Sequence, residues 1–139
     1  MNHVAVEQLQ ECNSGTLPGL DQTALTGTWI NTNSARSLIR RIEIAPGQKQ
    51  LTVHIFGAEP GLPEDWGMAE AHPFAENTAS GLAMAFSVLF DLDGIESLLQ
   101  GYVVKGVLVI VSFTQVKDGR DRSSSFGKEF FYRLHGTAF

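Results

Sequence analysis

The amino-acid sequence predicts an all-β protein, an antiparallel up-and-down barrel of about eight strands. Short apolar segments with period-two alternation recur at intervals of roughly ten to fifteen residues, and Gly, Pro, Asn and Asp turn sequences separate them. No long amphipathic helical pattern interrupts the series. The composition, 43% hydrophobic and 18% charged, is that of a globular chain that can bury a core.

The chain length of 139 residues indicates one domain. Residues 1–22 are polar and rich in turn-forming residues, so we expect an N-terminal arm or capping segment there, followed by a single barrel domain over 23–139. Cys12 lies in the arm without a neighbouring base, which indicates an incidental thiol rather than a nucleophile.

Charge and cysteine content exclude several classes of partner. Ten basic against fifteen acidic side chains leave a net charge of -5, which opposes binding to nucleic-acid phosphates. The single cysteine cannot form an internal disulfide, so we expect a cytoplasmic protein. No segment approaches the roughly twenty apolar residues of a membrane span, and the first residues lack the pattern of a signal peptide.

The first two predicted strands cover residues 25–31 and 36–44. The first is a short extended run that ends in an Asn/Ser cluster. The second alternates and is followed by a Pro-Gly turn. One face of this strand carries Leu38, Arg40, Ile42 and Ile44.

The third and fourth strands are expected over residues 51–56 and 65–74. Two prolines and two glycines within residues 57–63 separate them. The fourth strand has an alternative, because residues 68–71 could begin a helical turn, but Pro73 would end such a turn quickly. We therefore predict a strand.

The remaining four strands have the clearest patterns. Residues 82–90 carry a period-two apolar set, which an Asp-Gly turn follows at residues 93–94. Residues 95–105 and 107–116 then form a hairpin about Gly106, and residues 126–134 complete the series. The apolar set of the fifth strand is Leu82, Met84, Phe86, Val88 and Phe90.

Closure of the sheet follows from an energetic argument. This spacing of strands fits a sandwich or a barrel, but an open sheet would expose aggregation-prone edges such as residues 107–111, whereas a barrel has none. The fifth and seventh strands are apolar on both faces. Their outer face needs cover from the arm, a loop or a second subunit, and we predict a homodimer or a higher homo-oligomer.

Residues 25–29, Leu-Thr-Gly-Thr-Trp, resemble the Gly-x-Trp signature near the first strand of calycins, the lipocalin and avidin-like ligand-binding barrels. The resemblance covers five residues and implies a calycin-like barrel in which Trp29 plugs one end and Gly27 allows close backbone approach. An ordinary core tryptophan beside a turn glycine is the alternative.

Most of the chain also resembles a group of uncharacterised small barrel proteins. In that group two cysteines flank the loop before an Asp-Trp-Gly sequence; here Glu59 and Glu64 take those places, which removes a possible disulfide and adds two acids to the loop. The matching elements are Gly-Thr-Trp-Ile-Asn at 27–31, Val-His-Ile-Phe-Gly at 53–57, Asp-Trp-Gly at 65–67 and Phe-Tyr-Arg at 131–133.

Arg40 is the first candidate for chemistry. On an inward face its guanidinium would need an anionic or carbonyl partner, which a ligand oxygen can supply. Alternatively, Arg40 extends to the barrel mouth or pairs with Glu129 or Glu43. Tyr102 and Tyr132 offer further hydrogen-bond donors, although both are also ordinary core aromatics.

A second constellation combines two imidazoles and two carboxylates with a tryptophan, a set that can transfer protons or hold a metal ion. Trp66, Met68, Glu70 and His72 are expected on one face by alternation, but the set lacks a tight ligand motif, so we predict no metal and a structural His54. Its members are His54, Asp65, Trp66, Glu70 and His72.

These observations predict that the barrel binds a small hydrophobic molecule in an internal pocket. One alternative is a cofactor-free cyclase or isomerase in which Arg40 and Tyr102 polarise a substrate carbonyl. Another is a structural oligomer whose core is filled by side chains. No phosphate cradle, Cys/His framework or nucleophile motif calls for a cofactor. The expected ligand-binding residues are Trp29, Leu38, Ile42, His54, Trp66, Met84, Phe86, Val88 and Tyr132.

Overall fold

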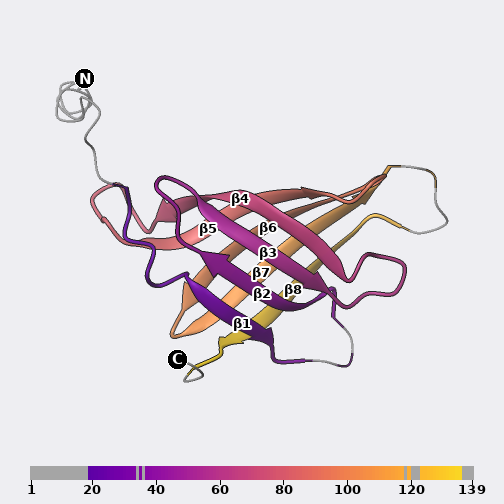
Figure 1. The fold of residues 1–139 in the computed structure, drawn as a ribbon, viewed down its shortest axis with the longest axis horizontal. Coiled ribbons are helices and arrows are strands. Elements are labelled where there is room, and N and C mark those ends of the chain that lie inside the picture. The colour runs from indigo at the N-terminus through magenta and orange to yellow at the C-terminus, as the bar shows by residue number, and fades with distance from the viewer. Residues whose placement is uncertain (1–18, 34, 36, 118, 120–122, 136–139) are drawn as a thin grey trace.

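The computed structural model describes residues 19–135 except 34, 36, 118 and 120–122. Its strands form one closed antiparallel barrel in which each strand pairs with its neighbours in the sequence and β8 returns to β1 (Figure 1). The all-β up-and-down barrel predicted from the sequence is therefore confirmed. The strands are β1 Gly27–Asn31, β2 Ile39–Ala45, β3 Leu51–Gly57, β4 Asp65–Ala75, β5 Ala83–Asp91, β6 Ile95–Val104, β7 Val107–Val116 and β8 Ser125–Arg133.

The predicted strand limits lie within three residues of the observed ones. β1 begins two residues later than expected, because the N–H groups of Leu25 and Thr26 both donate to the carbonyl of Gln22 at 3.0 and 3.2 Å. This turn folds Leu25, which is fully buried, onto the core. β4 is extended throughout, so the alternative of a helical turn over residues 68–71 is wrong. Most of the predicted arm over 1–22 lies outside the described residues.

Two tight turns set the register of β5, β6 and β7. Asp93 and Gly94 have φ angles of 63° and 91°, and Lys105 and Gly106 have 53° and 80°. Positive φ at both central residues is the type I′ geometry that matches the twist of a hairpin, and glycine adopts it without steric cost. The Asp-Gly turn and the hairpin about Gly106 are both confirmed.

One end of the barrel is closed by side chains of β1 and β8, and we call it the closed end. The guanidinium carbon of Arg133 lies 4.6 Å from the ring centroid of Trp29, a residue that is 1% exposed. Trp29 Nε1 donates to the Leu25 carbonyl at 3.0 Å, and Arg133 Nη2 donates to the Ala24 carbonyl. The opposite end, where β1 ends and β8 begins, is here called the mouth.

Candidate functional site

The middle of the barrel is filled by side chains. Ile42 is fully buried, and Phe86 and Val88 are 1% and 4% exposed. A Cβ atom added to Gly101 would lie 2.5 Å from the Phe86 ring and 2.9 Å from Ile110, so the packing at this level needs a glycine. The predicted pocket residues Trp29, Ile42, Phe86 and Val88 thus belong to a packed core.

Two further predicted pocket residues are less deeply placed. Met84 is half-buried, because β4–β5 pairing is irregular where Ala75 pairs with Ala83, and the simple alternation expected from Leu82 onward shifts there. Leu38 is also half-buried and lies at the mouth, where it lines a hollow described below.

The expected inward orientation of Arg40 is wrong. The pairing of β2 with β3 shifts register between Ile39 and Arg41, and this irregularity turns the Arg40 side chain outward, where it is exposed. Its guanidinium carbon lies 5.4 Å from the ring centroid of Phe56. The alternative pairing with Glu43 is made instead by Arg41, whose Nη2 is 3.0 Å from the Glu43 carboxylate.

The two tyrosines also lie outside the barrel. Alternation along β6 and β8 buries Gly101 and Phe131 and leaves Tyr102 and Tyr132 on the outer surface, 37% and 48% exposed. The expectation that Tyr102 and Tyr132 donate hydrogen bonds into an internal pocket is therefore wrong in orientation.

The constellation around His54 is divided between the two faces of the barrel wall. Gly67 has a φ of 84°, and the β3–β4 register shifts beside it, so Trp66 points inward while Met68, Glu70 and His72 are exposed. The predicted common face of these residues is wrong for this reason. Among the described residues, no group of three or more His, Cys, Asp and Glu side chains could hold a metal ion.

His54 and Asp65 remain together on the outer surface. His54 Nε2 lies 2.8 Å from Asp65 Oδ1, which also accepts the Gly67 N–H at 2.8 Å. Two hydrogen bonds lower the pKa of Asp65 below its ordinary value. The bond from the Gly67 N–H has the larger effect and the bond with His54 the smaller one. These contacts stabilise the bend at the start of β4, and neither side chain enters the barrel.

The mouth of the barrel contains a hollow that is lined partly by polar side chains. A hollow of about 410 Å³ opens there between the start of β8, the end of β7 and the loops that follow β1 and β3. Its lining combines apolar surface with hydroxyl and carboxylate groups. The lining residues are Ala35, Ser37, Leu38, Ala58, Glu59, Pro60, Ser112, Ser125, Phe126, Gly127 and Glu129.

Glu129 is the central side chain of this mouth pocket. It points inward from β8, two residues before the fully buried Phe131. One carboxylate oxygen, Oε1, accepts the Ile39 N–H at 3.2 Å and Asn31 Nδ2 at 3.1 Å, and Oε2 accepts the Leu38 N–H at 2.6 Å. Glu129 therefore links β8 to the ends of β1 and β2.

Burial raises the pKa of Glu129 above its ordinary value of 4.5. Hydrogen bonds from Leu38, Ile39 and Asn31 act in the opposite direction, and the charge of Glu59 adds to the increase. The carboxylate thus takes up a proton more readily than a solvated glutamate does.

Hydroxyl groups make one wall of the barrel interior polar toward the mouth. Ser97 Oγ and Thr114 Oγ1 hydrogen-bond at 3.0 Å, and Ser112, 4% exposed, lies opposite Gly127. Ser37 Oγ and Trp66 Nε1 are buried without a hydrogen-bond partner among the described residues. From the sequence Glu129 was expected only as a possible partner of Arg40, and this wall was not predicted. Alternation counted back from the buried Phe131 along β8 places Glu129 inside.

Comparison of the chain with protein-family models, curated proteins and solved structures found no match. Within the described residues, no helix has the length and apolar character needed to cross a membrane.

Proposed function

We propose that the mouth pocket binds a small, largely apolar molecule that carries a hydrogen-bond donor, such as an amine or a hydroxyl group. The observation that carries this proposal is the half-buried carboxylate of Glu129 on the wall of a 410 Å³ hollow. A carboxylate has about four acceptor positions. Among the described residues, Leu38, Ile39 and Asn31 occupy three of them, which leaves one for a ligand.

The rest of the lining suits an amphipathic molecule. Leu38, Pro60 and Phe126 supply apolar surface, and Ser37 and Ser112 supply hydroxyl groups. The hollow falls within the range of roughly 300 to 1,000 Å³ that is usual for small-molecule sites. Because Ser37 Oγ has no partner among the described residues, a polar ligand atom would compensate for the cost of its burial.

The negative charge at the mouth disfavours anionic ligands, the class that an inward Arg40 was expected to bind. Arg40 is on the outer surface, whereas Glu59 and Glu129 both line the pocket. The Glu129 carboxylate repels a carboxylate-bearing ligand and favours a donor or a cation. The proposed ligand is therefore a small hydrophobic molecule bound at the mouth, above the packed centre of the barrel.

A cofactor-free isomerase or cyclase is the second candidate, and the raised pKa of Glu129 favours it. In such an enzyme Glu129 would take a proton from a carbon next to a ketone and return it at another position. A cheap assay is exchange of the methyl protons of 2-acetonaphthone into D2O, followed by NMR. Exchange that the protein accelerates and that Glu129→Gln abolishes would support this activity.

We also propose that the barrel is calycin-like. The position of Trp29 on β1, buried at the closed end under Arg133, supports this relationship. The cytoplasmic location expected from the single cysteine remains a prediction.

NMR titration of the full-length, ¹⁵N-labelled chain tests the binding proposal with three probes that share one ring system. We expect 2-naphthylmethylamine and 2-naphthylmethanol to shift the amide signals of Leu38, Ile39, Gly127 and Glu129, and 2-naphthoate to shift them less. Equal or tighter binding of the carboxylate would contradict the assigned donor preference. No shifts at the mouth with any probe up to millimolar concentration would overturn the site.

A matched pair of variants locates the binding. Ala58 is exposed and lines the mouth pocket, so Ala58→Trp fills the hollow without disturbing the core. Ala45 is an exposed alanine near the closed end. We expect Ala58→Trp to weaken binding of the amine probe at least tenfold and Ala45→Trp to leave it unchanged.

A further inference from the structure

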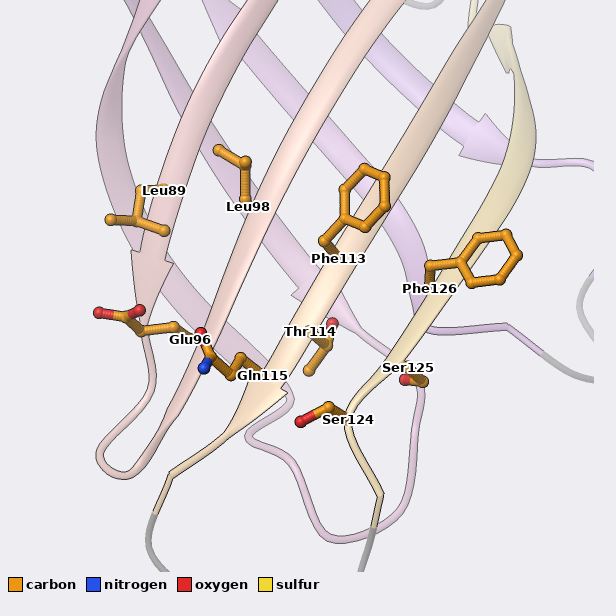
Figure 2. A pocket seen from close by; sticks show the side chains of 9 residues that line it. All are labelled: Leu89, Glu96, Leu98, Phe113, Thr114, Gln115, Ser124, Ser125 and Phe126. Carbon is orange, nitrogen blue, oxygen red and sulfur yellow. The ribbon is translucent and has the colours of Figure 1, made fainter.

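The outer surface of the barrel is more apolar over β5 to β8 than over β2, β3 and β4. On β2, β3 and β4 the outward side chains include Arg41, Glu43, Thr52 and Glu70. On β5 to β8 one row of paired residues is entirely apolar: Leu89 pairs with Leu98, Leu98 with Phe113, and Phe113 with Phe126. Figure 2 shows these four side chains across neighbouring strands.

Further apolar side chains extend this row toward the closed end. Tyr102 pairs with Val109 and Val109 with Phe130, while Tyr132 pairs with Val107. We call the outward surface of β5 to β8 the apolar face. Between its two main rows lies Lys128, and at its rim Glu96 is paired with Lys117 at 2.8 Å.

The exposed area of the apolar face is large for the surface of a monomer. Five aromatic residues are 37–77% exposed: Tyr102, Phe113, Phe126, Phe130 and Tyr132. At about 200 Å² per fully exposed aromatic side chain they present roughly 500 Å² to solvent. Leu89, Leu98 and Val104 are 38–54% exposed and, at about 120 Å² each when fully exposed, add between roughly 150 and 200 Å². The total approaches the ~800 Å² that each partner contributes to a standard interface.

We propose that the apolar face packs against the same face of a second copy of this chain, about a two-fold axis that runs parallel to the strands between β6 and β7. The area points to a protein partner, and the register of the strands points to an identical one. Such an axis places Phe113 of one copy over Leu98 of the other, and Phe126 over Leu89. Each aromatic ring then meets an aliphatic side chain.

The same symmetry is favourable in the adjoining rows. Phe130 lies over Ala85, and Lys128 lies over Ser87, so no like charges face each other. A barrel curves away on both sides of its contact line, so contact at β5 and β8 needs long, protruding side chains. The residues at these positions, Leu89 and Phe126, are 54% and 77% exposed. A groove of about 500 Å³ between Leu89, Leu98, Phe113 and Phe126 receives the partner's Phe126 (Figure 2).

Sedimentation velocity of the full chain tests this assembly. The measurement covers protein concentrations from about 1 to 100 µM, at which an interface of standard size is expected to form. We expect a dimer of twice 15.1 kDa. Phe126→Glu should raise the dissociation constant at least about 30-fold, because it removes a buried aromatic contact and places a charge against the partner's Leu89. Met68→Glu is the matched control, because Met68 is also a prominent apolar side chain, 68% exposed, and it lies on β4, outside the apolar face.

Cysteine cross-linking in a Cys12→Ser background tests the axis itself. A mixture of Leu98→Cys and Phe113→Cys chains should form disulfide-linked heterodimers faster than either chain forms homodimers. A chain that stays monomeric at 100 µM overturns the proposal. A trimer, or a dimer that Met68→Glu breaks and Phe126→Glu leaves intact, overturns it as well.

Discussion

Glu129→Gln tests the role of the mouth carboxylate in stability. The carboxylate accepts three hydrogen bonds, two at Oε1 and one at Oε2. Glutamine keeps a single carbonyl oxygen and turns a donor NH2 toward the other position. If its carbonyl replaces Oε1, the Leu38 N–H loses its acceptor; if it replaces Oε2, Ile39 and Asn31 lose theirs. Leaving one buried donor unpaired costs about 1 to 3 kcal/mol, and we expect a loss of this size in the free energy of unfolding.

Urea unfolding at pH 7 and fixed protein concentration, followed by tryptophan fluorescence, measures this loss. The denaturant slope should stay unchanged. Glu70→Gln is the control, because Glu70 is exposed on β4 and should change stability by no more than about 0.5 kcal/mol. A Glu129→Gln protein that is as stable as the Glu70→Gln protein would refute the assignment of these hydrogen bonds as a structural link.

The pH dependence gives the same variant a second readout. Because the pKa of Glu129 is raised in the folded state, the folded chain binds more protons than the unfolded chain between the ordinary value of 4.5 and the raised value. The stability contributed by proton uptake is fully present below 4.5 and is lost as the pH rises through the folded-state pKa. The stability difference between wild type and Glu129→Gln should therefore grow as the pH is lowered through this window. A difference that shrinks would contradict the sign of the shift.

Further substitutions at Gly101, Arg133 and Arg40 test the packing and the corrected register. Gly101→Ala should cost about 1 to 3 kcal/mol, because its Cβ would collide with Phe86 at 2.5 Å, whereas Gly81→Ala, which meets no atom within 4 Å, should be neutral in the same urea assay. Arg133→Met should lower the unfolding midpoint, since it removes the hydrogen bond at the closed end, and Arg40→Met should not. Arg40→Ala should leave binding of the naphthylmethylamine probe unchanged in the NMR titration. A tenfold loss of affinity would indicate that the Arg40 side chain contacts the ligand in the pocket.

Several features of the candidate site follow from the sequence only in part. The period-two pattern places Ile42, Phe86 and Val88 inside, and the structure agrees because cross-strand pairing there is regular. By the same rule Arg40 was assigned to the inner face, and Trp66 was assigned to one face with Met68, Glu70 and His72. Both assignments failed because Arg40 and Trp66 each lie beside a register irregularity. A shift of one residue reverses the faces of the side chains before it relative to those after it, and sequence spacing does not mark where the shift occurs.

Glu129 shows why the candidate site could not be predicted from the sequence alone. Its three hydrogen-bond donors come from residues about ninety positions earlier in the chain, and they reach it only because β8 closes the barrel against β1. Its raised pKa likewise depends on burial at the mouth and on the charge of Glu59, which a strand pattern does not contain.

The sequence by itself determined the local features of this protein: the all-β class, the number of strands, and turns such as Asp93-Gly94, because alternation and backbone preference act between near neighbours. The tertiary structure alone decided which face of each irregular strand turns inward, that the barrel centre is packed, and that the polar hollow lies at the mouth. Those properties depend on cross-strand register and barrel closure, which bring distant residues together and which no local pattern encodes.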